Sequence, residues 1–151
     1  AEELAKKYAL APYTMFIGSG ALWGETILFS MCILEEMQWK RTRYITSADF
    51  FHGTLELVEP GVPVFLFMGE DENRKLDERV RAFLTRGVTG DTDINIIDTA
   101  EFAIPGLDDE FRVIVSPWIL TVLVTDRLAR YYETVTKHNL NYRRYYHQFD
   151  Y

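Results

Sequence analysis

Residues 13–38, YTMFIGSGALWGETILFSMCILEEMQ, decide the fold. The short apolar run at residues 13–17 is typical of a buried strand, and the glycines that follow it at residues 18–20 predict a tight turn. From about residue 21 to 38 the sequence predicts a long helix. The centre of this helix is apolar almost all round, so it is expected to be covered on most sides. A buried strand, a glycine turn and a buried helix make the first unit of an α/β domain.

The same alternation continues along the rest of the chain. Further strands are predicted at residues 43–46, 63–68 and 94–97. Helices are predicted at residues 2–10, 48–57, 75–86 and 116–137. Ser47 and Ser116 are the expected N-caps of the second and fourth of these helices, with Pro117 at the first helical position. We therefore expect one domain, residues 1–151, folded as a three-layer αβα sandwich on a parallel sheet of four to five strands.

Composition narrows the class of protein further. The chain has 151 residues, 48% of them hydrophobic, and carries 16 basic and 23 acidic side chains for a net charge of −7. An acidic chain disfavours a nucleic-acid partner, because such binding depends on Lys and Arg. The single cysteine, Cys32, favours a reducing cytoplasmic location, and no apolar run is long enough to span a membrane. No group of residues has metal-ligand spacing, so no metal is expected. No organic cofactor is expected either, because no motif for one is visible.

The turn at residues 18–20 is the first candidate site. A glycine turn that opens a helix leaves backbone N–H groups free to bind an anion. The dinucleotide fingerprint G-x-G-x-x-G is not matched, because the third glycine, Gly24, comes one residue late. Anion binding and a plain strand-to-helix turn both remain open from the sequence.

Two side chains are candidates for proton transfer. Glu36 follows Phe29, Cys32 and Ile33 on one apolar stripe of the predicted helix. A buried carboxylate, suited to act as a general base, is therefore expected there. The alternative is that the helix has reached its exposed end. His52 lies between two aromatic residues and a glycine, which indicates a position lining a site. A histidine that only packs is the alternative.

These features together resemble a known domain. A strand that ends in Gly-Ser-Gly precedes a helix that ends in Glu36-Met37, and a His52-Gly53 pair follows sixteen residues after Glu36. This pattern resembles the sugar isomerase (SIS) domain, in particular the second SIS domain of glucosamine-6-phosphate synthase and of the fructosamine 6-phosphate deglycases. The segment 37–39 and the aromatic, basic segment 141–146 are more similar to the deglycases.

The resemblance implies roles for individual residues. Glu36 corresponds to the carboxylate that moves a proton between C1 and C2 of the sugar. His52 corresponds to the imidazole that assists ring opening and acts as the acid, and in the synthases it reaches into the neighbouring subunit's site. Ser19, Ser47 and Arg144 are the expected substrate-binding residues. The Ser/Thr-rich phosphate loop of the first SIS domain is absent, and the C-terminal segment has arginines where the synthase has a catalytic lysine.

The implied activity is cleavage of a 6-phosphorylated Amadori product, with 6-phosphofructose-aspartate favoured, to glucose 6-phosphate and the free amino acid. The alternatives are a non-catalytic SIS module that binds a sugar phosphate, and an aldose–ketose sugar-phosphate isomerase. A homodimer is expected. Because the chain begins at Ala1 directly in a helix, it is also expected to be the C-terminal half of a two-SIS-domain protein, whose N-terminal domain holds the phosphate.

Overall fold

The structure is a computed structural model that describes residues 1–87 and 89–150. Its centre is a sheet of four parallel strands: β1 (Tyr13–Gly18), β2 (Arg41–Ile45), β3 (Val64–Met68) and β4 (Ile94–Asp98). The strands lie in the order β2-β1-β3-β4. This confirms the predicted parallel α/β architecture. Strand β2 begins two residues before the predicted start, at Arg41.

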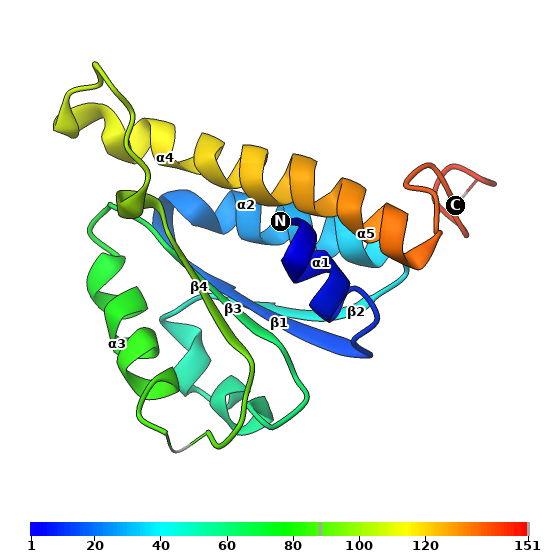
Figure 1. The fold of residues 1–151 in the computed structure, drawn as a ribbon, viewed down its shortest axis with the longest axis horizontal. Coiled ribbons are helices and arrows are strands. Elements are labelled where there is room, and N and C mark those ends of the chain that lie inside the picture. Colours follow the sequence, from blue (N-terminus) through cyan, green and yellow to red (C-terminus); the bar gives the residue numbers. More distant parts are fainter. Residues whose placement is uncertain (88, 151) are drawn as a thin grey trace.

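Helices cover both faces of the sheet (Figure 1). One face carries α1 (Glu2–Tyr8), α2 (Trp23–Ile27), α4 (Arg112–Leu120) and α5 (Ala129–Thr136). The opposite face carries α3 (Arg74–Leu84) and the short helical segments between residues 49 and 57. The predicted three-layer sandwich is therefore confirmed, with β1 and β3 buried between the layers.

The core divides into two parts because side chains alternate across the sheet. Phe16 lies on the α2 face, where its ring stacks on Phe65 at 5.2 Å between centroids and meets Phe29 edge-on at 5.4 Å. Met15 and Ile17 point to the α3 face. The unbroken apolar runs of β1 and β3 are thus explained by burial on both sides.

The long helix after β1 is continuous but not uniform. A 3₁₀ turn, Gly20–Leu22, leads into α2, and a π-helical segment, Leu28–Met37, completes it. The helix predicted at residues 21–38 is confirmed. Ser30, the one polar residue at its centre, is fully buried and donates its hydroxyl to the Thr26 carbonyl at 2.5 Å. A buried hydroxyl is tolerated there because the helix itself supplies the acceptor.

The last helix starts earlier than predicted, so the prediction that Ser116 is its N-cap is wrong. A 3₁₀ turn, Asp109–Phe111, leads into α4, so Pro117 lies inside the helix. Proline has no N–H to donate to the Val113 carbonyl four residues back. The Ser116 hydroxyl donates to this same carbonyl at 3.3 Å. The serine therefore compensates for the proline within the helix, which runs on through a π-helical segment, Thr121–Leu128, into α5.

The prediction of a helix at residues 48–57 is also wrong. Two 3₁₀ segments, Asp49–Phe51 and Thr54–Leu57, replace it. They are separated at Gly53, whose φ of 124° is a conformation that side-chain-bearing residues rarely adopt. Ser47 is not the cap, because the Asp49 N–H donates to the Thr46 hydroxyl at 3.0 Å while Ser47 is turned into the protein.

The core makes a direct prediction. Phe16→Ala should lower the free energy of unfolding by about 3–5 kcal/mol, because it removes a fully buried ring and leaves a cavity. Urea unfolding followed by circular dichroism measures the change. Leu10→Ala is the control, since Leu10 is 73% exposed and its truncation should cost less than about 0.5 kcal/mol. Equal losses for the two variants would contradict this account of the core.

Candidate functional site

The carboxyl ends of the four strands meet at one edge of the sheet, here called the carboxyl edge. Ser19 follows β1 and Ser47 follows β2, and both are buried. The Ser47 N–H donates to the Ser19 hydroxyl at 2.7 Å, and the Ser47 hydroxyl donates to Oδ1 of Asp77 at 2.5 Å. Burial raises the pKa of Asp77, whose other oxygen accepts the Gly69 N–H. A substrate phosphate would have to displace these bonds to reach either serine.

The glycine turn at residues 18–20 already holds an anion from the same chain. Oδ2 of Asp71 accepts the Ala21 N–H at 2.6 Å, and its Oδ1 accepts the Asn73 N–H at 2.7 Å. Burial alone would raise the pKa of Asp71, but these hydrogen bonds outweigh it and lower the pKa. A Cβ at Gly20, where φ is 55°, would lie 2.1 Å from Oδ2 of Asp71. The turn thus binds an anion, and that anion is a side chain.

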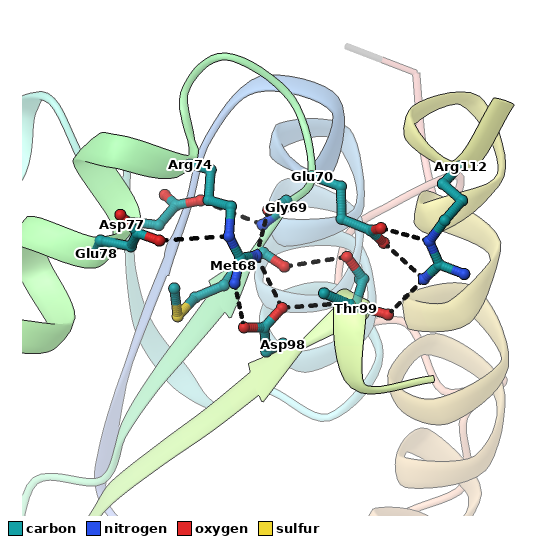
Figure 2. Close-up of polar contacts among 10 residues, drawn as sticks. Met68, Gly69, Glu70, Arg74, Asp77, Glu78, Asp98, Thr99 and Arg112 are labelled. Carbon is teal, nitrogen blue, oxygen red and sulfur yellow. Dashed lines mark hydrogen bonds and ion pairs between the residues drawn. The ribbon is translucent and has the colours of Figure 1, made fainter. Parts of the chain in front are cut away.

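Two buried or half-buried ion pairs close the rest of this edge (Figure 2). Arg74 of α3 makes two bonds to Asp98 at the end of β4, of 2.9 and 2.6 Å. Arg112 of α4 makes two bonds to Glu70, of 2.5 and 3.1 Å. The Arg74 guanidinium holds the pKa of Asp98 below its ordinary value. These pairs were not predicted, because their members are far apart in the sequence.

The Arg74–Asp98 pair predicts a pH-dependent stability. Asp98→Asn keeps the shape of the side chain but removes its charge, and should lower the free energy of unfolding at pH 7 by about 1.5–3 kcal/mol. The pKa of Asp98 is lower in the folded state than its ordinary 3.8. The contribution is therefore fully present above about pH 4 and is lost as the pH falls through the lowered pKa. The difference between variant and parent should narrow accordingly.

Chemical denaturation at a series of pH values measures this difference. Asp126→Asn is the matched control, because the Asp126–Arg130 pair is exposed on both sides and should contribute at most about 1 kcal/mol. A difference between Asp98→Asn and the parent that stayed constant down to pH 2 would show that the ion pair is not its cause.

The opposite edge of the sheet, here called the amino edge, carries a pocket of about 450 Å³. The π-helical segment Leu28–Met37 runs back to this edge, and β2 starts there at Arg41. The C-terminal tail, residues 139–150, forms the other wall. The pocket is lined by Glu35, Glu36, Trp39, Lys40, Arg41, Arg143, Arg144, Tyr145 and Tyr146.

Glu36 lies in this pocket and is not the buried carboxylate predicted from its apolar stripe. Its side chain is 30% exposed, and Oε1 lies 2.9 Å from Nε of Arg143 in the tail. The tail thus supplies a cation where the sequence predicted apolar cover. Glu35 points differently, since its Oε1 accepts the Thr42 hydroxyl at 2.5 Å. The two adjacent acids therefore have separate partners, and Glu36 is the one paired with the tail.

Gln38 and Trp39 fix the tail over the pocket. Gln38 is buried, accepts the Thr136 hydroxyl at 2.8 Å and donates to the His138 carbonyl at 2.6 Å. Trp39 has a φ of 53°, and its ring meets the His138 ring edge-on at 4.4 Å. Arg144 places its guanidinium 4.2 Å from the Trp39 ring. No pattern in the sequence predicts these contacts, apart from the likeness of segment 37–39 to the deglycases.

His52 lies away from the pocket. It sits after the carboxyl end of β2, between the two 3₁₀ segments on the α3 face, where Phe50 and Phe51 pack against Phe83. His52 itself is exposed, so the prediction of a lining position is wrong within a single chain. One chain therefore does not bring Glu36 and His52 together.

Residues 1–87 and 89–150 lack two features that would point to other kinds of function. No group of three or more His, Cys, Asp or Glu side chains is arranged to hold a metal ion. None of the helices formed by these residues is long and apolar enough to cross a membrane.

Comparison with curated proteins gives the family context. No protein-family model matches the chain. The fructosamine deglycase FrlB of Bacillus subtilis (strain 168) is 30% identical over 148 residues, and the fructoselysine 6-phosphate deglycase of Escherichia coli (strain K12) is 34% identical over 116 residues. This chain is homologous to the fructosamine and fructoselysine 6-phosphate deglycases. The matches cover 96% and 75% of this chain but only 43% and 31% of the two relatives. The chain therefore spans less than half of the length of either relative.

Solved structures agree on the fold of this deglycase homologue. A Bacillus subtilis protein described as a phosphosugar isomerase superposes with a TM-score of 0.88 at 28% identity, over 99% of this chain and 44% of that one. A second match is the C-terminal domain of a glucosamine-fructose-6-phosphate aminotransferase from Francisella tularensis, with a TM-score of 0.61 over 92% of this chain and 40% of that one. At 13% identity, this is a likeness of fold alone. The predicted SIS fold is confirmed.

Proposed function

We propose that this domain carries the proton-transfer residues of a deglycase for 6-phosphorylated fructosamines. The observation that supports it best is the amino-edge pocket, in which Arg143 holds the Glu36 carboxylate in an open site. Homology to the deglycases supports this reaction class. The favoured substrate is 6-phosphofructose-aspartate, which would yield glucose 6-phosphate and aspartate. A cytoplasmic location, expected from the single cysteine, belongs to the same proposal.

The proposed chemistry is acid–base catalysis on the open-chain substrate. The Glu36 carboxylate removes a proton from C1, next to the C2 carbonyl, and the C2 oxygen gains a proton to give an enaminol. Return of a proton to C2, with loss of the proton on the amine nitrogen, converts the enaminol into an imine between C1 and that nitrogen. Water adds to C1 and expels the amine, which leaves the C1 aldehyde of glucose 6-phosphate. No redox change occurs, and every proton removed is returned.

His52 acts, in this proposal, in the site of a neighbouring subunit. Its side chain is exposed and outside the pocket of its own chain, so it is free to enter another. A two-fold homodimer would give each Glu36 a His52 from the partner subunit. The imidazole would assist ring opening, the step that exposes the C2 carbonyl to Glu36.

The phosphate is proposed to bind to a separate, N-terminal SIS domain. The turn at residues 18–20 is filled by Asp71, and the hydroxyls of Ser19 and Ser47 are engaged within the chain. The homologue also spans less than half of its curated relatives, which leaves room in them for a further domain. The proposal therefore assigns no phosphate-binding role to Ser19 and Ser47.

An exposed apolar face supports a partner domain. Phe111, Ile114, Trp118 and Val122 follow one another along one side of the helix that contains α4, and each is at least 44% exposed. Contiguous exposed apolar side chains of this size commonly mark an interaction surface. We propose that this face packs against the N-terminal domain.

The test is turnover by the full-length protein that carries this domain. Glu36→Gln and His52→Ala should each reduce release of glucose 6-phosphate from 6-phosphofructose-aspartate by about 10²–10⁴-fold, the usual contribution of a general acid or base. A coupled dehydrogenase assay measures the product. Glu35→Gln is the matched control, since Glu35 lies in the same pocket but is bonded to Thr42. It should retain most of the activity.

Mixing the two inactive variants tests the subunit exchange. In a mixed dimer, the intact Glu36 of one subunit meets the intact His52 of the other, so one site should recover activity. Absence of recovery in confirmed mixed dimers would contradict the partner role of His52. Near-parental turnover by Glu36→Gln would contradict the role of Glu36 as the base. Absence of turnover by the parent protein would leave the isomerase and binding-module alternatives.

A further inference from the structure

The amino-edge pocket is rich in positive charge, although the whole chain carries a net charge of −7. Four cationic side chains and two carboxylates line it. Glu36 is paired with Arg143, and Glu35 is bonded to Thr42. The four cations therefore outnumber the two carboxylates by two. An anionic group on the substrate is the natural complement of such a pocket.

Lys40 is the first of these cations. Its side chain is half-buried in the pocket wall, and its backbone is held by the bond from its N–H to the Leu34 carbonyl at 2.8 Å. Within residues 1–87 and 89–150, no carboxylate or carbonyl accepts a hydrogen bond from its ammonium. Burial accordingly lowers the pKa of Lys40. A half-buried ammonium without an anion is unfavourable, and an incoming anion would compensate it.

Arg144 is the second, and it is held in position before any ligand enters. Its guanidinium lies 4.2 Å from the centroid of the Trp39 ring. The His138 ring also contacts the Trp39 ring. A guanidinium stacked on an aromatic ring uses its face for that contact and keeps the N–H groups of its edge free. Those N–H groups form a fork that matches the two oxygens of a carboxylate.

We propose that Lys40 and Arg144 form a carboxylate subsite that recognises the amino-acid half of the substrate, an inference that rests on the proposed function. In a fructosyl amino acid, only the amine nitrogen and one carbon separate C1 from the carboxylate. The phosphate lies at the far end of the six-carbon chain. Since Glu36 must reach C1, the anion that enters its own pocket is the carboxylate.

Two substrates that differ only in this group test the subsite. Fructosyl-glycine 6-phosphate carries the carboxylate, and fructosyl-methylamine 6-phosphate lacks it. On the full-length protein, Lys40→Met and Arg144→Met should each raise KM for the glycine compound about tenfold or more, the equivalent of one charge-assisted hydrogen bond. KM for the methylamine compound and kcat for both should change little. Arg144→Lys, which keeps the charge but not the fork, should lie between Arg144→Met and the parent.

Lys75→Met on the exposed side of α3 is the control for charge alone and should leave both substrates unaffected. An equal rise in KM for both compounds would overturn the subsite, because it would mean that the two cations bind the phosphate. Unchanged KM for the glycine compound would also overturn it. If the parent protein releases glucose 6-phosphate from neither compound, the proposed function itself fails and the subsite with it. Thermal unfolding of each variant confirms that the fold is intact.

Discussion

The four strands of this domain run parallel, so each connection must cross a face of the sheet and return to the edge where the previous strand began. Strand ends therefore collect at the carboxyl edge, and helix ends collect at the amino edge. Ser19, Ser47 and Asp98 meet at the first edge for this reason. Glu36, at the end of a returning helix, is placed at the second. The direction of the strands thus separates the two polar clusters of the molecule.

The carboxyl edge is where α/β sheets commonly bind ligands, yet here the chain satisfies it internally. Asp71 occupies the backbone N–H groups that open the first long helix, and Asp77 takes the hydroxyl of Ser47. Each carboxylate loses hydration on burial and regains hydrogen bonds from donors of the chain itself. With Arg74 and Arg112 paired across the same edge, the arrangement fixes the loops after β3 and β4. This edge therefore has a structural role within the domain.

The amino edge contrasts with this closed network, because its pocket is assembled from two distant parts of the chain. The segment around Gln38 follows the first long helix, and the tail follows the last one. The amide of Gln38 bonds to Thr136 and to the His138 carbonyl, and a buried amide so satisfied fixes the geometry of both segments. Arg143 then pairs with Glu36, and Arg144 lies against the Trp39 ring. The pocket remains accessible, because Arg144 is exposed and the tail covers Glu36 only in part.

The sequence by itself determined the parallel α/β fold, since the apolar runs of β1 and β3 and the helices between the strands follow directly from hydrophobic pattern. It also singled out Glu36, through its apolar stripe, and His52, through its aromatic and glycine neighbours. It could not place Pro117 inside a helix, because the compensating bond from Ser116 depends on helix geometry. Only the tertiary structure decided that Glu36 faces the tail, that His52 lies elsewhere and that Asp71 fills the turn. These contacts join residues far apart in sequence, and local pattern carries no information on which distant charge will come within bonding distance.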